Sequence, residues 1–336
     1  MSFKPWALAA TVIAAVVIAT TVWYPRNTSP KVSPTVMSSD EKQALEELAR
    51  LLPGRVIFDS NRSGNFGIYS ITTGGEDVRT IVDTDAHEVY PDPSPDGTSV
   101  VYGRTNSLER TASADVWIVA IDGSNPRMLA EDGTYPTFSA DGKTVFFERG
   151  RKQVMAINLD GTNLREIFPA NNQKFKRAAV VKPRVSIDGK ILTFTSDKPR
   201  RWNAWYADLT TGEAFHIAHA CEPALSNRGD FFAFIGKKEM EMAERSGIGK
   251  RDRKTGAISK LQDADAPWGH EYFPTLARDD QFLLYSACPE GQHAPEDSNF
   301  QLFIKDLTTG KVTRLTFDGH NNRWAKLVSR SETPGS

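Results

Sequence analysis

The sequence is poor in several features that mark particular classes of protein. It has 2 cysteines in 336 residues, so it can form at most one disulfide. Its 41 basic and 42 acidic residues give a net charge of −1, so no overall field favours nucleic acid as a partner. It lacks the Gly-x-Ser-x-Gly motif of serine hydrolases. Gly247–Lys250 lacks the spacing of a phosphate-binding loop, and helical periodicity is almost absent.

What the sequence does contain is a short phrase that recurs about every 40 to 50 residues. The clearest copies are Tyr90–Gly97, Tyr135–Gly142 and Lys182–Gly189, and the weaker copies are Glu222–Gly229 and Phe273–Asp280. A fixed period of this length, made of strands and turns, is typical of a propeller or another repeat array.

Each opening phrase is followed by apolar runs that indicate strands. The runs directly after the phrases are β-branched and aromatic: Ser99–Tyr102, Thr144–Phe147, Ile191–Phe194, Phe231–Phe234 and Phe282–Tyr285. The Asp-Gly pair supplies the positive φ of a tight hairpin turn. A third run, a second turn such as Asp122–Asn125 and a short fourth strand complete the unit. Four strands per unit is the composition of a propeller blade.

The number of blades follows from counting the two turns of each unit. The second turn occurs six times but the opening phrase only five, because the first unit begins with its second strand, Arg55–Phe58. The missing strand is supplied by Asn322–Leu327, where Trp324-Ala325 stands in place of Tyr-Pro or Phe-Pro. We therefore predict an all-β, six-bladed propeller whose C-terminal strand closes the first blade and leaves no long unpaired edge.

These residues resemble the TolB-type, WD-like propeller repeat. Its Pro-x-x-Ser-Pro-Asp-Gly consensus, apolar strands and Arg-Leu-Thr ending are matched by Pro91–Gly97, Ile68-Tyr69 and Arg314–Thr316. The resemblance extends over about residues 55–328. It implies the propeller fold, and the family includes periplasmic scaffolds, propellers fused to peptidases or kinases, and oligogalacturonate lyases. This chain carries no peptidase or kinase domain.

The N-terminus predicts export and a membrane anchor. Trp6–Tyr24 is an uncharged apolar run long enough to cross a bilayer, with Lys4 before it and aromatic residues at both ends. A cleaved signal peptide is the alternative. We expect an anchor at 1–25, a Pro/Ser/Thr linker at 26–38, a helix at 39–53, the propeller at 54–330 and a disordered tail at 331–336. The expected location is the inner membrane, with the propeller in the periplasm.

The short helix has its own signals. Ser38–Glu41 has the spacing of a capping box. Ala44, Leu45, Leu48, Leu51 and Leu52 recur at helical spacing, and Pro53-Gly54 ends the helix. We expect its apolar face to pack on the propeller, with a partner-binding helix as the alternative.

The two cysteines fall in neighbouring blades on one face. Cys221 precedes the opening strand of the fifth unit and Cys288 follows the second strand of the sixth. An oxidising compartment would permit a disulfide between them, and a reduced pair is the other possibility.

Ionisable residues gather in the loops that lead into the blades, at the predicted mouth of the channel. They are His87, Glu88, His219, Glu222, His270, Glu271 and His320. Such groups could bind a divalent metal or transfer protons. We expect His87, His270 and His320 to approach one another. The alternative is that these groups only hydrogen-bond loops and line a wet channel.

A second set of residues is basic and lies in two loops of the fourth unit, on the same face. It comprises Lys174, Lys176, Arg177, Lys182, Lys198, Arg200 and Arg201, together with Trp202. Arginine suits carboxylate or phosphate recognition and stacks on aromatic rings. A solvated run of charge is the alternative.

The sequence therefore predicts a non-catalytic scaffold that binds an envelope protein or an anionic glycan, with residues 6–24 in the inner membrane and no cofactor. The alternative is a metal-assisted lyase of the oligogalacturonate lyase type, with a divalent metal at the channel mouth. A third possibility is a sensory or structural module whose function depends more on its membrane tether than on ligand binding in its pocket.

Overall fold

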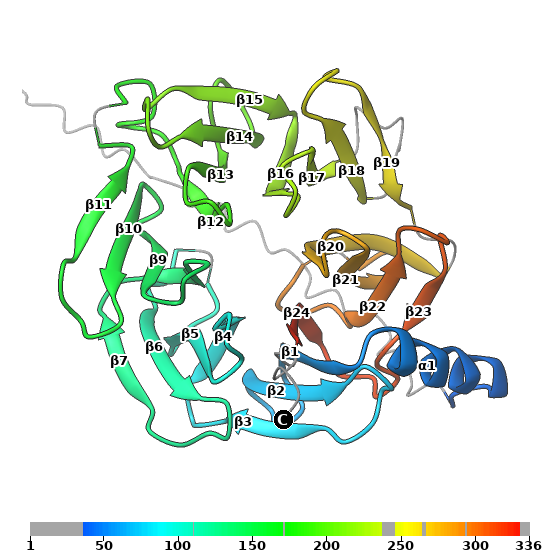
Figure 1. Ribbon diagram of the computed structural model, residues 1–336. Coiled ribbons are helices and arrows are strands. Elements are labelled where there is room, and N and C mark those ends of the chain that lie inside the picture. Colours follow the sequence, from blue (N-terminus) through cyan, green and yellow to red (C-terminus); the bar gives the residue numbers. More distant parts are fainter. Residues whose placement is uncertain are drawn as a thin grey trace, which may run out of the picture. The chain divides into compact units, whose positions relative to one another are not determined.

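Six four-stranded antiparallel sheets are arranged around a central axis in the computed structural model (Figure 1). The structure describes residues 36–109, 111–170, 172–236, 246–263, 267–292 and 294–329. All of these belong to one of the two compact units of the chain, residues 31–336. The predicted six-bladed propeller is confirmed.

In the first three blades the strands follow one another from the axis outward. Blade 1 is β24 (Asn322–Ser329), β1 (Gly54–Ser60), β2 (Gly67–Thr72) and β3 (Arg79–Val82). Blade 2 is β4 (His87–Pro93), β5 (Ser99–Thr105), β6 (Asp115–Ala120) and β7 (Arg127–Ala130). Blade 3 is β8 (Thr134–Phe138), β9 (Thr144–Arg149), β10 (Gln153–Asn158) and β11 (Arg165–Phe168).

The remaining blades repeat the pattern. Blade 4 is β12 (Val181–Val185), β13 (Ile191–Ser196), β14 (Asn203–Asp208) and β15 (Ala214–Ala218). Blade 5 is β16 (Ala220–Leu225), β17 (Phe231–Gly236), β18 (Gly247–Asp252) and β19 (Ile258–Gln262). Blade 6 is β20 (Trp268–Ala277), β21 (Phe282–Pro289), β22 (Gln301–Asp306) and β23 (Val312–Arg314).

The C-terminal strand closes the propeller as the turn count predicts. β24 pairs antiparallel with β1, from Gly54 opposite Ser329 to Ser60 opposite Asn322. Within this pair, Arg323 Nε and Nη2 donate to Asp59 Oδ1 and Oδ2 at 3.0 and 3.1 Å, and both side chains are buried. The two ends of the propeller are thus joined by a strand ladder and a bidentate ion pair.

Helix α1 (Ser39–Leu51) packs against blades 1 and 6 (Figure 1), and the boundary between these two blades is called the seam below. Its capping box is formed: Glu41 N donates to Ser38 Oγ at 3.2 Å, and Ser38 N donates to Glu41 Oε2 at 2.8 Å. Leu45, Leu48 and Leu52 are buried in one core cluster with strands of blades 1 and 6. The prediction that the apolar face packs on its own propeller is confirmed.

The expected membrane span, Trp6–Tyr24, and most of the expected linker fall outside the described residues. Among the described residues, none of the helices has the length and apolar character needed to cross a membrane.

The disulfide predicted as one possibility is not formed. Cys221 and Cys288 pack in the same apolar cluster, but no bond joins them. The Cys288 thiol instead donates to the carbonyl of Gln292 at 3.2 Å. Burial raises the pKa of Cys288 to about 12, so it remains a thiol.

Candidate binding site at the centre of the propeller

One residue from each of the six innermost strands lies at the centre of the molecule. These residues are Tyr90, Tyr135, Lys182, Glu222, Phe273 and Trp324, called the central ring below. Each has a φ between +50° and +58°, and each sits at a shift in register between the first and second strands of its blade. This left-handed conformation is rare for bulky residues and is retained where the surroundings fix it.

Side chains of adjacent blades receive the backbone N–H groups at these shifts. Tyr90 N donates to Asp59 at 3.2 Å, and Lys182 N donates to Glu148 at 2.9 Å. Glu222 N donates to Thr195 at 2.8 Å. Each of these contacts satisfies a buried donor that the strand ladder leaves without a carbonyl.

Aromatic side chains fill most of the central ring. The Tyr90 and Tyr135 rings stack with centroids 4.0 Å apart, and the Phe273 and Trp324 rings stack at 4.3 Å. The Trp324 ring meets the edge of Tyr90 at 5.2 Å and so joins the two stacks. Stacked and edge-on aromatic pairs of this kind stabilise a packed cluster beyond the effect of their buried area.

Lys182 and Glu222 complete the central ring as an ion pair. The Lys182 ammonium contacts the Glu222 carboxylate, whose side chain is 1% exposed. The same ammonium lies 5.6 to 5.9 Å from the centroids of Tyr135, Phe273 and Trp324. Burial lowers the pKa of Lys182, but the surrounding acidic groups, Glu222 first among them, raise it by more, so the pKa lies above its ordinary value. Lys182 is therefore a protonated group rather than a nucleophile.

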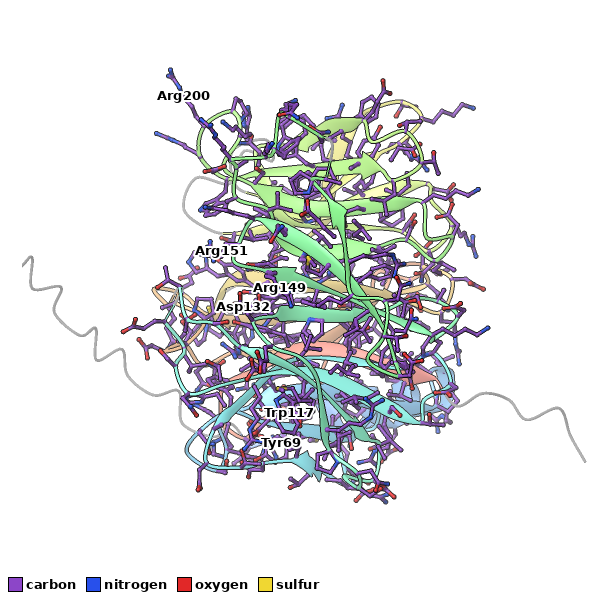
Figure 2. All side chains as sticks on the ribbon, turned by 90° about the vertical axis from the view of Figure 1, so that its left-hand side faces the viewer. Tyr69, Trp117, Asp132, Arg149, Arg151 and Arg200 are labelled. Atoms are coloured by element: carbon purple, nitrogen blue, oxygen red, sulfur yellow. The ribbon has the colours of Figure 1, made fainter. Side chains whose placement is uncertain are left out.

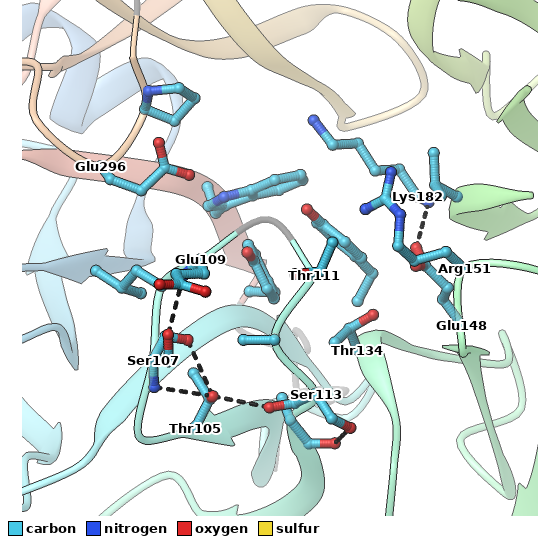
Figure 3. A pocket seen from close by; sticks show the side chains of 18 of the residues that line it. Thr105, Ser107, Glu109, Thr111, Ser113, Thr134, Glu148, Arg151, Lys182 and Glu296 are labelled. Atoms are coloured by element: carbon cyan, nitrogen blue, oxygen red, sulfur yellow. Dashed lines mark hydrogen bonds between the residues drawn. The ribbon is translucent and has the colours of Figure 1, made fainter. Parts of the chain in front are cut away.

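A cavity of about 820 Å³ lies above the central ring (Figure 3). Its floor is formed by Tyr90, Tyr135, Lys182, Phe273 and Trp324. On the other side of the floor the space narrows to about 20 Å³, roughly the room of one water molecule. The central ring thus closes the channel and leaves a pocket that opens on one face, of the size that small ligands occupy.

The walls of the cavity come from loops of the two kinds expected to share a face, called the long-loop face below. Residues 107–109 and 111–114 lie between β5 and β6, and 294–297 lie between β21 and β22, whereas Thr134 and Val181 begin the inner strands of blades 3 and 4. Arg151 lies in the turn between β9 and β10.

One buried acid on the wall titrates near neutral pH. Glu148 is 2% exposed and accepts the Lys182 N–H. Burial raises the pKa of Glu148 to about 7, although Lys182, Arg151 and Thr134 act in the opposite direction. A carboxyl group in this range changes its charge at physiological pH and is a frequent mark of a functional site.

Comparison with solved structures places this fold among known propellers. TolB from Acinetobacter baumannii matches with a TM-score of 0.65 and 17% identity, over 85% of this chain and 69% of its own. The fold is that of a TolB-type propeller. A TolB from Agrobacterium tumefaciens matches with a TM-score of 0.59 and 14% identity, over 82% of this chain and 98% of its own.

More distant matches add nothing on the chemistry. An oligogalacturonate lyase in complex with manganese has a TM-score of 0.49 and 13% identity, over 79% of this chain and 74% of its own. No protein-family model and no curated protein matches the sequence.

The histidines of this TolB-type propeller do not converge. His87 Nδ1 accepts the Phe66 N–H at 3.2 Å, His270 Nδ1 accepts the Ser246 N–H at 3.2 Å, and His219 Nδ1 contacts Asn203 Oδ1 at 2.7 Å. His320 contributes main-chain contacts to Asp318 and Gln301. In the described part of the chain no three His, Cys, Asp or Glu residues are placed to hold a metal ion. The described residues thus provide no ion site shared by His87, His270 and His320, and the rings of His87 and His270 bond to the Phe66 and Ser246 N–H groups of different blades.

The acids of the same predicted set have separate surroundings. Glu88 is buried and pairs with Arg104 at 3.6 Å, and Glu271 is buried and accepts from Gln262 at 3.1 Å. None of the seven predicted channel-mouth residues lines the cavity, and only Glu222 belongs to the central ring.

The basic loops of blade 4 lie on the long-loop face but mostly outside the cavity. Figure 2 shows Arg200 extending into solvent on the side where Arg151 and Asp132 lie. Lys176, Arg177, Arg200 and Arg201 are exposed. The Lys174 ammonium lies 3.9 Å from the centroid of Trp205, and the half-buried Lys198 accepts from the Trp205 indole through its carbonyl.

Within the predicted basic set, Trp202 and Lys182 line the cavity. Sequence reasoning missed Tyr90, Tyr135, Phe273 and Trp324 as site residues, although they begin the repeated phrases. Their recurrence at the same position of successive units could have indicated that they meet at the axis of the propeller. Glu109, Arg151 and Glu296 carry no repeated signal, since each lies in a connection that differs between blades. Glu148 lies on a second strand, where the corresponding acceptors of blades 1 and 4 are Asp59 and Thr195.

Proposed function

We propose that the protein is a non-catalytic binding scaffold of the cell envelope that captures a protein partner on its long-loop face. The observation that carries this function is the aromatic-floored cavity of about 820 Å³ at the centre of that face. Aromatic and arginine side chains dominate the energy of protein recognition, and Trp202, Trp324 and Arg151 are such residues at the cavity.

The location is part of the same proposal. Residues 6–24 anchor the chain in the inner membrane, and the propeller faces the periplasm. The support is the uncharged apolar run with Lys4 before it. A tether of this kind limits how the propeller can turn and raises the effective concentration of its binding face near the membrane.

The experiment is co-purification of partners from envelope membranes with the full-length chain. A variant with Arg200, Arg201 and Trp202 changed to alanine should lose the partner. The matched control reverses charge on the opposite face, at the hairpin turns of Asp141 and Asp188, and should keep it. Loss of the partner only in the control variant would place binding on the turn face and overturn the proposal.

The alternative, a metal-assisted lyase acting on an acidic oligosaccharide, has less support. The rings of two of its predicted histidines, His87 and His270, bond to backbone groups of different blades, and only Glu148 offers an acid of near-neutral pKa at the cavity among the described residues. Turnover of oligogalacturonate by the purified propeller, lost in Glu148→Gln, would favour the lyase over the scaffold.

A further inference from the structure

The cavity carries two basic side chains on one wall, beside the buried Glu148, and exposed carboxylates on the opposite wall. Figure 3 shows Arg151 and Lys182 pointing into it from one side, the cation wall, and Glu109 and Glu296 from the other, the acid wall. The two walls come from different blades: Arg151 and Lys182 from blades 3 and 4, and the acids from loops of blades 2 and 6. The separation is therefore built into the loop placement of the propeller.

The acid wall is exposed and its carboxylates are available to a ligand. Glu109 and Glu296 are exposed, and neither carboxylate has a hydrogen bond or an ion pair with any residue that the structure describes. Asp297 adds further acid next to Glu296, whereas the Asp132 carboxylate, in the loop that leads into blade 3, accepts from the Ser113 hydroxyl. Arg323, which also lines the cavity, is held by Asp59.

The cation wall is set deeper, beside the aromatic floor. The Lys182 side chain is 25% exposed and is held from below by Glu222, so its charge faces the cavity from a fixed position. The Arg151 guanidinium lies 5.9 Å from the ring centroid of Trp202, which also lines this part of the cavity. Between the two walls the aromatic residues of the floor, Tyr90, Tyr135, Phe273 and Trp324, offer stacking but no charge.

This arrangement discriminates by charge. A ligand with only negative charge is repelled by Glu109 and Glu296, and a ligand with only positive charge is repelled by Arg151 and Lys182. A molecule with a carboxylate at one end, an ammonium at the other and an apolar middle satisfies both walls and the floor. A short peptide with free termini has this chemistry.

We propose that the cavity binds short zwitterionic peptides, with the C-terminal carboxylate at Arg151 and Lys182 and the N-terminal ammonium at Glu109 and Glu296. The inference rests on the proposed function to the extent that it takes the long-loop face as the binding face, and it names the chemistry that the centre of that face recognises.

The test is calorimetric titration of the full-length protein with Ala-Phe-Ala in three forms: free at both ends, amidated at the C-terminus, and acetylated at the N-terminus. The free peptide should bind at least about tenfold more tightly than either blocked form, since each blocked form loses one charged contact. Arg151→Gln should reduce the preference over the amide, which Lys182 alone then supports, and keep the preference over the acetylated form. Glu296→Gln should do the opposite.

Both variants retain the Lys182–Glu222 pair, and thermal unfolding checks that they are folded. Equal affinity for the three forms, or absence of saturable binding by all of them, would overturn the proposal. If the peptides fail but the alanine variant at 200–202 still loses its partner, the scaffold function stands without this ligand. If the peptides bind as expected and no partner is lost, the cavity is a peptide site and the scaffold function fails.

Discussion

Six residues at equivalent positions decide what the centre of this propeller looks like. In each blade the positive φ of the central-ring residue turns its side chain toward the axis, and a shift in register accommodates the turn. Four of the six are aromatic, so the channel is closed by stacked rings, and the remaining two form an ion pair. The cavity is closed on one side because the central ring fills the channel.

Removing Lys182 should destabilise the fold, because it leaves the buried Glu222 carboxylate without its cation. We expect Lys182→Met to lower the free energy of unfolding by about 3 kcal/mol. The double variant Lys182→Met, Glu222→Gln should recover most of that loss, since a neutral amide can still accept the Phe273 N–H. Chemical denaturation of the single and double variants measures this. A double variant no more stable than Lys182→Met would contradict the ion-pair account.

Glu148 should give the protein a pH-dependent stability. Its pKa is raised from 4.5 to about 7 in the folded state, so the folded protein holds a proton that the unfolded chain releases between these values. The contribution is fully present below pH 4.5 and is lost as the pH rises through about 7.

The matched variant is Glu148→Gln, which keeps an acceptor for the Lys182 N–H. Relative to this variant, the wild type should lose about 3 kcal/mol of unfolding free energy across that range. Denaturant titrations at several pH values compare the two proteins. Parallel stability curves would show that Glu148 titrates normally.

At the scale of elements, helix α1 stabilises the seam between blades 1 and 6 because its apolar side chains pack on strands of both blades. Leu48 is buried in the shared core, whereas Leu51 on the same helix is 49% exposed. Leu48→Ala should lower the free energy of unfolding by about 3 kcal/mol, and Leu51→Ala should change it by less than about 0.5 kcal/mol. Thermal unfolding distinguishes them, and equal effects would mean that the helix does not hold the seam.

The elements could be predicted from the sequence because their signals are repeated. Asp-Gly turns, apolar runs and the missing first phrase define the strands, the blade count and the role of β24, and Ser38 and Glu41 mark the start of α1. Each signal depends on local backbone chemistry, which acts within a few residues.

The site was less predictable because side-chain direction depends on more than the loop that holds a residue. His87 and His270 lie at or near the start of inner strands, yet their rings turn to Phe66 and Ser246. Tyr90 and Phe273, a few residues further on, point to the axis because of their positive φ. The pairing of Lys182 with Glu222 joins residues 40 positions apart, and no local pattern indicates it.

At the scale of the whole molecule, stability depends on joining the two ends of the propeller. Deleting residues from Asn321 onward removes the β24 ladder, the Trp324 stacks and the only cation that pairs with the buried Asp59 among the described residues. We expect a loss on the order of 5 kcal/mol or more. Deleting only residues 331–336 is the control and should leave thermal unfolding unchanged. Similar unfolding of both truncations would refute closure by β24.

The central claim is that the long-loop face, and the cavity at its middle, receives the partner. Photo-crosslinking in intact envelopes tests it most directly, with a photoreactive phenylalanine analogue placed either at Thr111 beside the cavity or at Asp141 on the turn face. The account predicts a discrete crosslinked partner from position 111 and none from position 141. Crosslinks from position 141 alone would contradict it.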